Sequence, residues 1–435
     1  ETYQKKILSR LKFELTNDQN KSLHEINLDL KSSQKMFRLL QGDVGSGKTI
    51  VALCAAANVI KSGFQVAVMA PTEILARQHF DLAKKIFDKN INLEILSSKT
   101  EYKQKKTITN KLKEKEIDII FGTHAIFQKK ILFNKLGLII IDEQHKFGVN
   151  QRKKLSDKGG DDCDVLLMSA TPIPRTLTMT IYGDMDLSII REKPKSRKEV
   201  KTYSKLESKI DDILKFIKKE INNGNQIFWV CPLIEESKKI DHSSAVQKYE
   251  FLKKKFPNKV DLLHGKTDFD KKDIILKNFL NQKTKILVST TVIEVGIDFP
   301  NANVIIIENA NKFGLSQLHQ LRGRVGRGEK QSTCILMFKS KLTENAKKRL
   351  NILKSSTDGF VISEEDMKLR GFGDILGFKQ SGVKIFKLAD PVHNKDLFEL
   401  AEKEIKFMQK NNIQLNKYKT LMKLYDQADV INDIV

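Results

Sequence analysis

Short runs of apolar and β-branched residues recur along the chain, separated by longer stretches with helical spacing. In the first half the runs are MFRLLQ ending at Gln41, QVAVMA at Ala70, IDIIF at Phe121, LGLIIID at Asp142 and DVLLMS at Ser169. In the second half they are QIFWVC ending at Cys231, VDLLH at His264, KILVST at Thr290, NVIIIE at Glu308 and TCILMF at Phe338. Such runs, apolar on both faces and alternating with helices, predict parallel strands buried between helices. The repetition predicts two α/β domains in tandem.

Two breaks in this pattern divide the chain. The segment REKPKSRKEV, from Arg191 to Val200, is almost all charge and contains a proline, which predicts a linker. After about residue 345 the strand rhythm stops, and a stripe at helical spacing predicts a helix with a buried apolar face, formed by Leu397, Leu400, Ala401, Ile405 and Met408. We therefore expect three parts, 1–192, 193–345 and 346–435. Ligands of an open α/β sheet bind where its strands end, so residues that follow the runs are candidates for function.

The first run is followed by GDVGSGKT, which matches the phosphate loop G-x-x-x-x-G-K-[ST] and leads into the helix-like TIVALCAAANVI. Backbone N–H groups of such a loop surround phosphates, here those of Gly42, Asp43, Val44, Gly45, Ser46 and Gly47. Lys48 would reach the β and γ oxygens of ATP, and Thr49 would place its hydroxyl on Mg²⁺. A glycine turn with an incidental lysine is the alternative, but the strand before and the helix after favour the ATP site.

The run LGLIIID ends in an acidic pair, Asp142 and Glu143. In nucleotide hydrolysis the first carboxylate of such a pair holds Mg²⁺ through water, and the second orients and deprotonates the attacking water. Acidic pairs at strand ends are common on protein surfaces, so the pair alone is a weak signal. Together with the phosphate loop it predicts hydrolysis of ATP.

The second half contains QLRGRVGR, from Gln320 to Arg327. Arg324 and Arg327 are three residues apart, so on a helix they would point the same way. We expect them to enter the ATP site of the first domain as arginine fingers. A basic helix that lies on DNA is the rival interpretation.

Charge and cysteine content limit the class of protein. The chain carries 77 Lys and Arg against 54 Asp and Glu, a formal +23, which favours a phosphate-rich partner such as nucleic acid, although the vocabulary of an AT-rich genome gives a similar excess. The four cysteines stand far apart without zinc spacing, so we expect no structural metal and a reducing compartment. No apolar run approaches the roughly 18 residues of a membrane span, and no signal peptide opens the chain, which predicts a cytoplasmic protein without a membrane partner. The start at Glu1 suggests that upstream sequence is missing.

In their order and over most of the chain, these segments resemble the motifs of superfamily 2 helicases. The resemblance implies two RecA-like P-loop NTPase domains, each a parallel sheet flanked by helices, with ATP hydrolysed in the cleft between them and a helical C-terminal extension. The segment FELTNDQ resembles the adenine-reading motif, which implies Gln19 as the base contact and Phe13 as a stacking partner.

Further motifs carry over residue by residue. APTEILARQH and GTHAIF resemble strand-tracking motifs, and SATPIPRT and TTVIEVGIDFPNA resemble the motifs that couple the ATP site to DNA. The resemblance assigns to the nucleotide site Gly296, Asp298 and Gln320. It assigns to DNA contact or coupling Thr72, Arg77, Thr123, His124, Thr171, Arg175, His264, Thr290 and Thr291.

Several longer strings resemble the RecG family in particular, namely DEQHKFGV, SATPIPRTLTMTIYGDMD and ENANKFGLSQLHQLRGRVGRG. The later segment STDGFVISEEDMKLRGFGDILGFKQSG resembles the translocation motif, a helical hairpin and loop that this family shares with the transcription-repair coupling factor. By that match the lever is formed by Arg370, Gly371, Gly373, Asp374 and Gln380. The resemblance implies an ATP-dependent helicase or translocase that acts on branched DNA, such as replication forks and Holliday junctions, in repair and recombination, with duplex and branched DNA as its partner.

The sequence also departs from the family. Lys266 stands where arginine is usual, and Phe372 replaces a usual proline in the lever loop. RecG-like proteins carry a wedge domain ahead of the motor, and this chain starts just before the adenine-reading segment, so we expect it to lack junction recognition. The alternatives are a translocase of the transcription-repair coupling type, against which DEQH argues, a primosome-type helicase, whose zinc-binding cysteine pairs are absent, and a non-catalytic DNA-binding scaffold, against which the intact catalytic positions argue. The sequence does not identify a protein partner.

Overall fold

The computed structural model describes residues 2–11, 13–97, 100–128, 130–143, 163–171, 185–194, 198–232, 238–265, 267–290, 299–326, 328, 330–370, 394–411 and 413. The chain divides into two compact units. The first comprises Glu1–Pro172 and Met185–Ser363 and holds both sheets, and the second comprises Ile173–Asp184 and Glu364–Val435.

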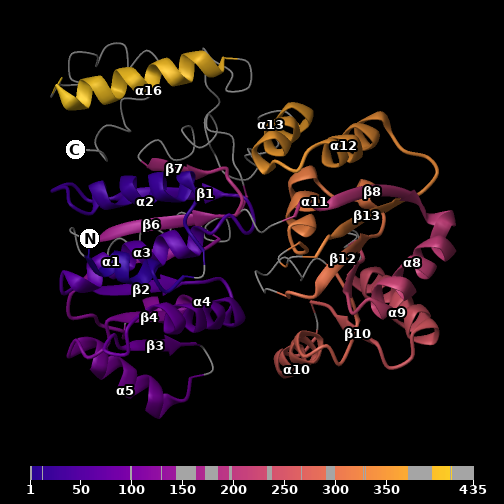
Figure 1. The fold of residues 1–435 in the computed structure, drawn as a ribbon, viewed down its shortest axis with the longest axis horizontal. Coiled ribbons are helices and arrows are strands. Elements are labelled where there is room, and N and C mark those ends of the chain that lie inside the picture. The colour runs from indigo at the N-terminus through magenta and orange to yellow at the C-terminus, as the bar shows by residue number, and fades with distance from the viewer. Residues whose placement is uncertain are drawn as a thin grey trace. The chain divides into compact units, whose positions relative to one another are not determined.

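The first sheet has seven strands, all paired in parallel, in the order β3-β4-β2-β5-β6-β1-β7. In Figure 1 they run from indigo to magenta. Their bounds are β1 Phe37–Gly42, β2 Gln65–Met69, β3 Leu93–Leu96, β4 Ile119–Gly122, β5 Leu136–Ile141, β6 Asp164–Ser169 and β7 Asp186–Ile190.

Successive residues of these strands face opposite sides of the sheet, as the two-residue period of a strand requires. Leu40 and Phe121 face one side, which is covered by α1 (Thr2–Leu8), α2 (Asn17–Asp29), α3 (Lys48–Lys61) and α4 (Glu73–Ile86). Leu39 and Ile120 face the other side, against α5 (Tyr102–Lys113) and the 3₁₀ turn η1 (His124–Phe127). The central strands are therefore buried on both faces, which is why their sequences are apolar without alternation.

The second sheet has six parallel strands in the order β10-β11-β9-β12-β13-β8. Their bounds are β8 Lys201–Leu206, β9 Gln226–Val230, β10 Val260–Leu263, β11 Ile286–Ser289, β12 Ala302–Ile307 and β13 Thr333–Phe338. When β8 to β13 are paired in chain order with β1 to β6, the two sheets have the same strand order.

Two sets of helices cover the second sheet. The 3₁₀ turn η3 (Glu207–Lys209) leads into α8 (Ile210–Asn222), which packs with α9 (Lys238–Lys255) on the face of Trp229. The face of Phe228 packs against α10 (Phe269–Leu280), α11 (Leu315–Arg322), α12 (Glu344–Ser355) and Ile362 of α13 (Gly359–Arg370). The 3₁₀ turn η5 (Ala310–Lys312) precedes α11, and α16 (Lys395–Lys410) is the last described helix.

A buried glutamine makes equivalent hydrogen bonds to the backbone in both sheets. Gln65 opens β2 and donates from Nε2 to the carbonyls of Leu112 and Ile117, across the turn from α5 to β4. Gln226 opens β9 and donates to the carbonyls of Phe279 and Thr284, across the turn from α10 to β11. Each glutamine thus holds in place the helix-to-strand turn that precedes the neighbouring strand.

The fold class predicted from the sequence is confirmed, because every apolar run forms a strand of one of two parallel sheets. The three strands that the sequence reading missed are β3, β7 and β8. The charged segment from Arg191 to Val200 lies between β7 and β8. Among the helices that the structure describes, none is long and apolar enough to cross a membrane.

The apolar stripe near the C-terminus corrects one expectation. Its residues do form a helix, α16, but Leu397, Leu400 and Ile405 are each about half exposed, at 47%, 54% and 54%. The predicted core packing of this stripe is therefore wrong for the described residues. Helical spacing shows which residues share a face, and it does not show what covers that face.

Candidate nucleotide site

The predicted phosphate loop connects the end of β1 at Gly42 to the start of α3 at Lys48. Gly47, the N-cap of α3, has φ +84°, a left-handed conformation that side chains rarely adopt. A Cβ atom on Gly47 would also overlap the side-chain amide of Gln19. Both constraints favour glycine here, directly before the first turn of α3, where the backbone N–H groups of a helix can bind an anion.

Polar groups of this loop fit a bound phosphate. Lys48 is buried, and its Nζ donates to the carbonyl oxygens of Gly42 at 2.8 Å and of Asp43 at 3.0 Å. The hydroxyl of Ser46 is buried and has no hydrogen-bond partner among the described residues. A buried hydroxyl without a partner costs free energy, so this group favours a ligand that can accept a hydrogen bond from it.

The acidic pair follows β5. It therefore lies at the carboxyl ends of the parallel strands, as the phosphate loop after β1 does. Asp142 is buried, its Oδ2 lies 2.8 Å from Nε2 of His79 on α4, and its Oδ1 accepts from the backbone N–H of Glu143. Burial alone would raise the pKa of Asp142, but the hydrogen bond from His79 and the charge of Lys48 outweigh it and lower the pKa. Asp142 is therefore held as a carboxylate, the form that binds Mg²⁺.

Glu143 has φ +55°, which is uncommon for a residue with a side chain. Such backbone strain persists where the surroundings impose it, and it often occurs at functional sites. His79 was not identified from the sequence as a site residue. It is the last residue of the motif APTEILARQH, and no local pattern indicates its contact with Asp142.

Gln19, the predicted adenine contact, is buried beside the phosphate loop. Its Nε2 donates to the carbonyl of Ser46 at 2.7 Å, and its Oε1 accepts from the backbone N–H of Thr16 at 2.9 Å. Thr16 and Gln19 form a capping box that starts α2. Gln19 thus ties α2 to the loop, a contact that the sequence reading missed. Phe13, the predicted stacking partner, is 51% exposed.

The prediction that Arg324 lies on a helix is wrong. Helix α11 ends at Arg322, Gly323 is its C-cap, and Gly326 has φ +80°, so Arg324 lies in the turn that follows the helix. Arg324 is buried, and Arg327 lies outside the described residues. The backbone of Gly323 packs against Val44 of the phosphate loop, where a Cβ atom would approach Cβ of Val44 to 2.9 Å.

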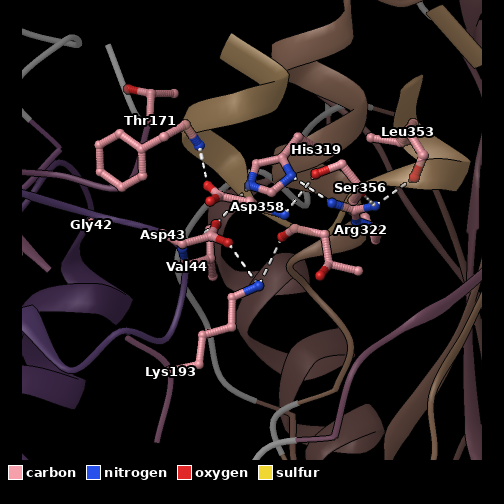
Figure 2. A network of polar contacts seen from close by, with 12 residues as sticks. Gly42, Asp43, Val44, Thr171, Lys193, His319, Arg322, Leu353, Ser356 and Asp358 are labelled. Atoms are coloured by element: carbon pink, nitrogen blue, oxygen red, sulfur yellow. Dashed lines mark hydrogen bonds and ion pairs between the residues drawn. The ribbon is translucent and has the colours of Figure 1, made fainter. Parts of the chain in front are cut away.

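Asp43 of the phosphate loop forms two contacts that the sequence reading missed (Figure 2). Its Oδ1 lies 2.7 Å from Nε2 of His319 on α11, and its Oδ2 lies 3.1 Å from Nζ of Lys193 in the linker. Burial alone would raise the pKa of Asp43, but the hydrogen bond from His319 and the charge of Lys193 hold it well below its usual range. Asp43 is therefore a buried carboxylate that contacts two distant side chains, and its Oδ1 also accepts from the backbone N–H of Val44 at 2.7 Å.

Most of the remaining predicted residues lie just after a strand or within a helix. Thr72 caps α4 by accepting from the N–H of Leu75, Thr171 bonds to Ser169 through its hydroxyl, and the N–H of His264 donates to Thr267. Other described members are Arg77, which is exposed, Thr123 and His124 at the start of η1, Gln320 on α11 and Thr290 after β11, which is buried. Predictions that lie outside the described residues concern Arg175, Thr291, Gly296, Asp298, Arg327, Gly371, Gly373, Asp374, Gln380 and the side chain of Arg370.

The described residues indicate neither a disulfide bond nor a metal site built from side chains. All four cysteines are free and buried. No group of three or more His, Cys, Asp or Glu side chains that could hold a metal ion occurs among the described residues.

The comparisons with known proteins agree with this geometry. The model of the DEAD/DEAH box helicase family matches residues 16–180, and that of the helicase conserved C-terminal domain matches residues 208–329. The ATP-dependent DNA helicase RecG of Bacillus subtilis is 50% identical over 402 residues, which are 92% of this chain and 59% of that protein. RecG of Aquifex aeolicus is 47% identical over 432 residues, which are 98% of this chain and 54% of that protein.

A solved structure of RecG bound to a three-way DNA junction superimposes with a TM-score of 0.77 at 43% identity, over 91% of this chain and 52% of that one. The DEAD-box helicase Mss116 shares the fold, with a TM-score of 0.61 at 19% identity over 88% of this chain and 93% of that one, in a complex with single-stranded RNA and AMP-PNP. The chain spans between half and three fifths of the length of the RecG proteins that it matches. On this similarity, the chain belongs to the RecG family of DNA helicases.

Proposed function

We propose that this chain is the ATP-hydrolysing motor of a helicase that moves on duplex DNA and acts on branched DNA. One observation carries the proposal: the phosphate loop and the acidic pair lie at one edge of the first sheet, within a chain 43% identical to a RecG solved on a DNA junction. The formal charge of +23 supports contact with a phosphate backbone. We also propose a cytoplasmic location, because the curated relatives are bacterial DNA helicases.

The site residues divide the work of hydrolysis. Mg²⁺, when bound with ATP, neutralises charge on the transferred phosphate. Thr49 and Asp142 are the residues that would hold it, since a hydroxyl and a carboxylate are the ligands that it prefers. Lys48 neutralises the phosphates, and Glu143 orients the attacking water and accepts its proton. Arg324, joined by Arg327, stabilises the charge that develops in the transition state.

DNA contact and movement rest on the motif residues of both sheets. We propose that Thr72, Arg77, Thr123, His124 and Thr171 contact or sense the strand, because their motifs follow the strands of the first sheet. Arg370 and Gln380 are proposed as lever residues. In that role, substituting either one uncouples ATP hydrolysis from movement.

Basal and DNA-stimulated ATP hydrolysis of the chain test this function. We expect the chain to hydrolyse ATP faster with duplex DNA than without it, and Glu143→Gln to abolish turnover in both conditions. A chain that binds ATP and duplex DNA without hydrolysing ATP would instead be a DNA-binding scaffold.

Branch recognition is tested separately, because the chain spans only part of its relatives. Backbone contacts are largely independent of sequence and weaken with salt, so we expect this chain to bind forked and linear duplexes with similar affinity. Competition binding with the two DNAs measures the preference. A strong preference for the fork would place junction recognition within this chain.

A further inference from the structure

Two chains of polar contacts leave the carboxylate of Asp43 and meet at residues 353–358, which we call the α12–α13 junction (Figure 2). In the first arm, Asp43 contacts His319, and Nη2 of Arg322 lies 2.9 Å from Nδ1 of His319. Nη1 of Arg322 then donates to the carbonyls of Leu353 and Ser356, both at 2.7 Å. The first arm therefore ends at the C-terminus of α12.

The second arm is shorter and passes through the linker. Nζ of Lys193 lies 3.1 Å from Oδ2 of Asp43 and donates to the carbonyl of Thr357 at 2.9 Å. One ammonium group thus bridges the phosphate loop and the α12–α13 junction. Both oxygens of the Asp43 carboxylate are used, one by each arm.

The direction of each hydrogen bond in the first arm follows from the chemistry of the donors. A guanidinium group has no acceptor, so Nδ1 of His319 must accept from Arg322. The ring proton of a neutral histidine then lies on Nε2, which donates to Asp43. The carbonyls that receive Arg322 are at the C-terminus of α12, the negative end of the helix dipole, which favours a cation there.

The first arm is shielded from water. Asp43, His319 and Arg322 are 6%, 4% and 3% exposed. A buried polar group that loses its partner keeps the full cost of its desolvation. Loss of one contact in this arm therefore destabilises the others. The arm is therefore a continuous series of buried contacts from the phosphate loop to the C-terminus of α12.

Asp43 is also linked to the centre of the nucleotide site. Its backbone carbonyl accepts from Nζ of Lys48, the group that is proposed to bind the phosphates of ATP. Lys48 has three N–H donors, and the carbonyls of Gly42 and Asp43 use two of them. A phosphate that draws Nζ of Lys48 away from these carbonyls would weaken a contact that holds the backbone of Asp43.

We propose that Asp43 is a positioning residue that ties the phosphate loop to the α12–α13 junction through two arms, His319 with Arg322 and Lys193. A displacement of the loop by nucleotide is passed to the junction by these arms. The inference rests on the proposed function only in assuming that the loop binds ATP, and the connection itself is testable without nucleotide.

Amide hydrogen exchange of the chain, without nucleotide or DNA, tests the connection. Protected amides report on the junction, because Asp358 N–H donates to Ser356 Oγ, Phe360 N–H to Asp358 Oδ1 and Ile362 N–H to Asp358 O. We expect Asp43→Ala and Lys193→Met each to accelerate exchange at these amides by about tenfold or more, because each removes a hydrogen bond to a charged group. The exposed Lys198 lies in the same linker, and Lys198→Met is the matched control, expected to leave exchange unchanged.

A general loss of stability is distinguished by strand β4, whose exchange should stay unchanged in all three variants. The double variant Asp43→Ala, Lys193→Met should exchange at the junction less than the product of the two single effects, because both act through one carboxylate. Multiplicative effects, or unchanged exchange at the junction in Asp43→Ala, would overturn the proposal. Lys193→Met removes a half-buried side chain, so it keeps the test decisive if Asp43→Ala does not fold.

The nucleotide step is tested by adding a non-hydrolysable ATP analogue. We expect the analogue to change junction exchange in the parent chain and to have no effect there in Asp43→Ala, although binding of the analogue is retained. A change of equal size in both proteins would overturn transmission through Asp43. Failure of the parent chain to bind the analogue would count against the proposed function, and the nucleotide-free comparison would still decide whether Asp43 ties the loop to the junction.

Discussion

Replacing Gly47 by alanine separates two reasons for glycine in the phosphate loop. Gly47 and Gly63 have nearly the same backbone, with φ +84° and +82°. A Cβ atom at Gly47 would overlap the side-chain amide of Gln19, whereas the nearest atom at Gly63 is Nζ of Lys115 at 3.5 Å, an ordinary contact with a flexible side chain. Gly63→Ala is therefore a control that carries the backbone strain alone.

The structure gives the size of the difference. The left-handed conformation costs alanine about 1 kcal/mol relative to glycine at either position. At Gly47 the displaced Gln19 also loses its hydrogen bonds to Ser46 and Thr16, each contributing about 1 kcal/mol. We expect Gly47→Ala to destabilise the chain by about 3 kcal/mol and Gly63→Ala by about 1 kcal/mol.

Urea unfolding followed by circular dichroism measures the effect, with the shift in midpoint compared between the two variants. Nucleotide binding should weaken in Gly47→Ala alone, because only that change displaces the loop. Equal midpoints for the two variants would refute the reasoning, since they would show that the contact between Gln19 and the loop does not contribute to stability.

Three further predictions follow from the site and its surroundings. Lys48→Ala should weaken ATP binding and abolish turnover, whereas Glu143→Gln should bind ATP and fail to cleave it; near-normal hydrolysis by Glu143→Gln, measured as phosphate release, would contradict its role. Arg324→Ala should lower turnover by a factor on the order of 10³ with little change in ATP affinity, and normal hydrolysis with salt-sensitive DNA binding would instead indicate a phosphate contact. Burial raises the pKa of Cys54, Cys163 and Cys334 to about 12, so a thiol reagent at pH 8 should label none of them until the chain unfolds, and stability should fall as the pH rises above about 8.5, where the unfolded thiols ionise first. Mass spectrometry after labelling checks this, and rapid labelling of the folded chain would show that these thiols are accessible.

The sequence predicts the buried strands of this fold better than its edges. The central strands have apolar residues on both faces, whereas β8 reads KTYSKL, and all of its residues are exposed or half-buried. β7 and β8 each lie at an edge of a sheet, where fewer neighbours demand apolar side chains. The short β3 is the edge strand on the other side of the first sheet and was missed for the same reason.

The site shows the same division between local and long-range information. The spacing of glycines and Lys48 is local, so the sequence predicts the phosphate loop without a structure. The contacts of Asp43 with Lys193 and His319 span 150 and 276 residues, and no local pattern indicates them. The end of α11 was predictable, because Gly323 stands where a helix commonly terminates, but the spacing of the arginines was read as helical.

The equivalent hydrogen bonds of Gln65 and Gln226 bear on the evolutionary origin of this chain. In both sheets a glycine two residues earlier has a left-handed backbone, Gly63 at φ +82° and Gly224 at +80°, and the turn that the glutamine spans contains Lys115 or Gln282 at φ +62° or +57°. Such agreement in detail, together with the common strand order, points to descent of both halves from one duplicated gene. In the second copy, the place of the phosphate loop is taken by the turn at Glu207–Lys209, which has no glycine. Duplication followed by loss of the phosphate loop in the second copy would leave ATP binding to the first copy. The second copy would then be free to diverge in sequence.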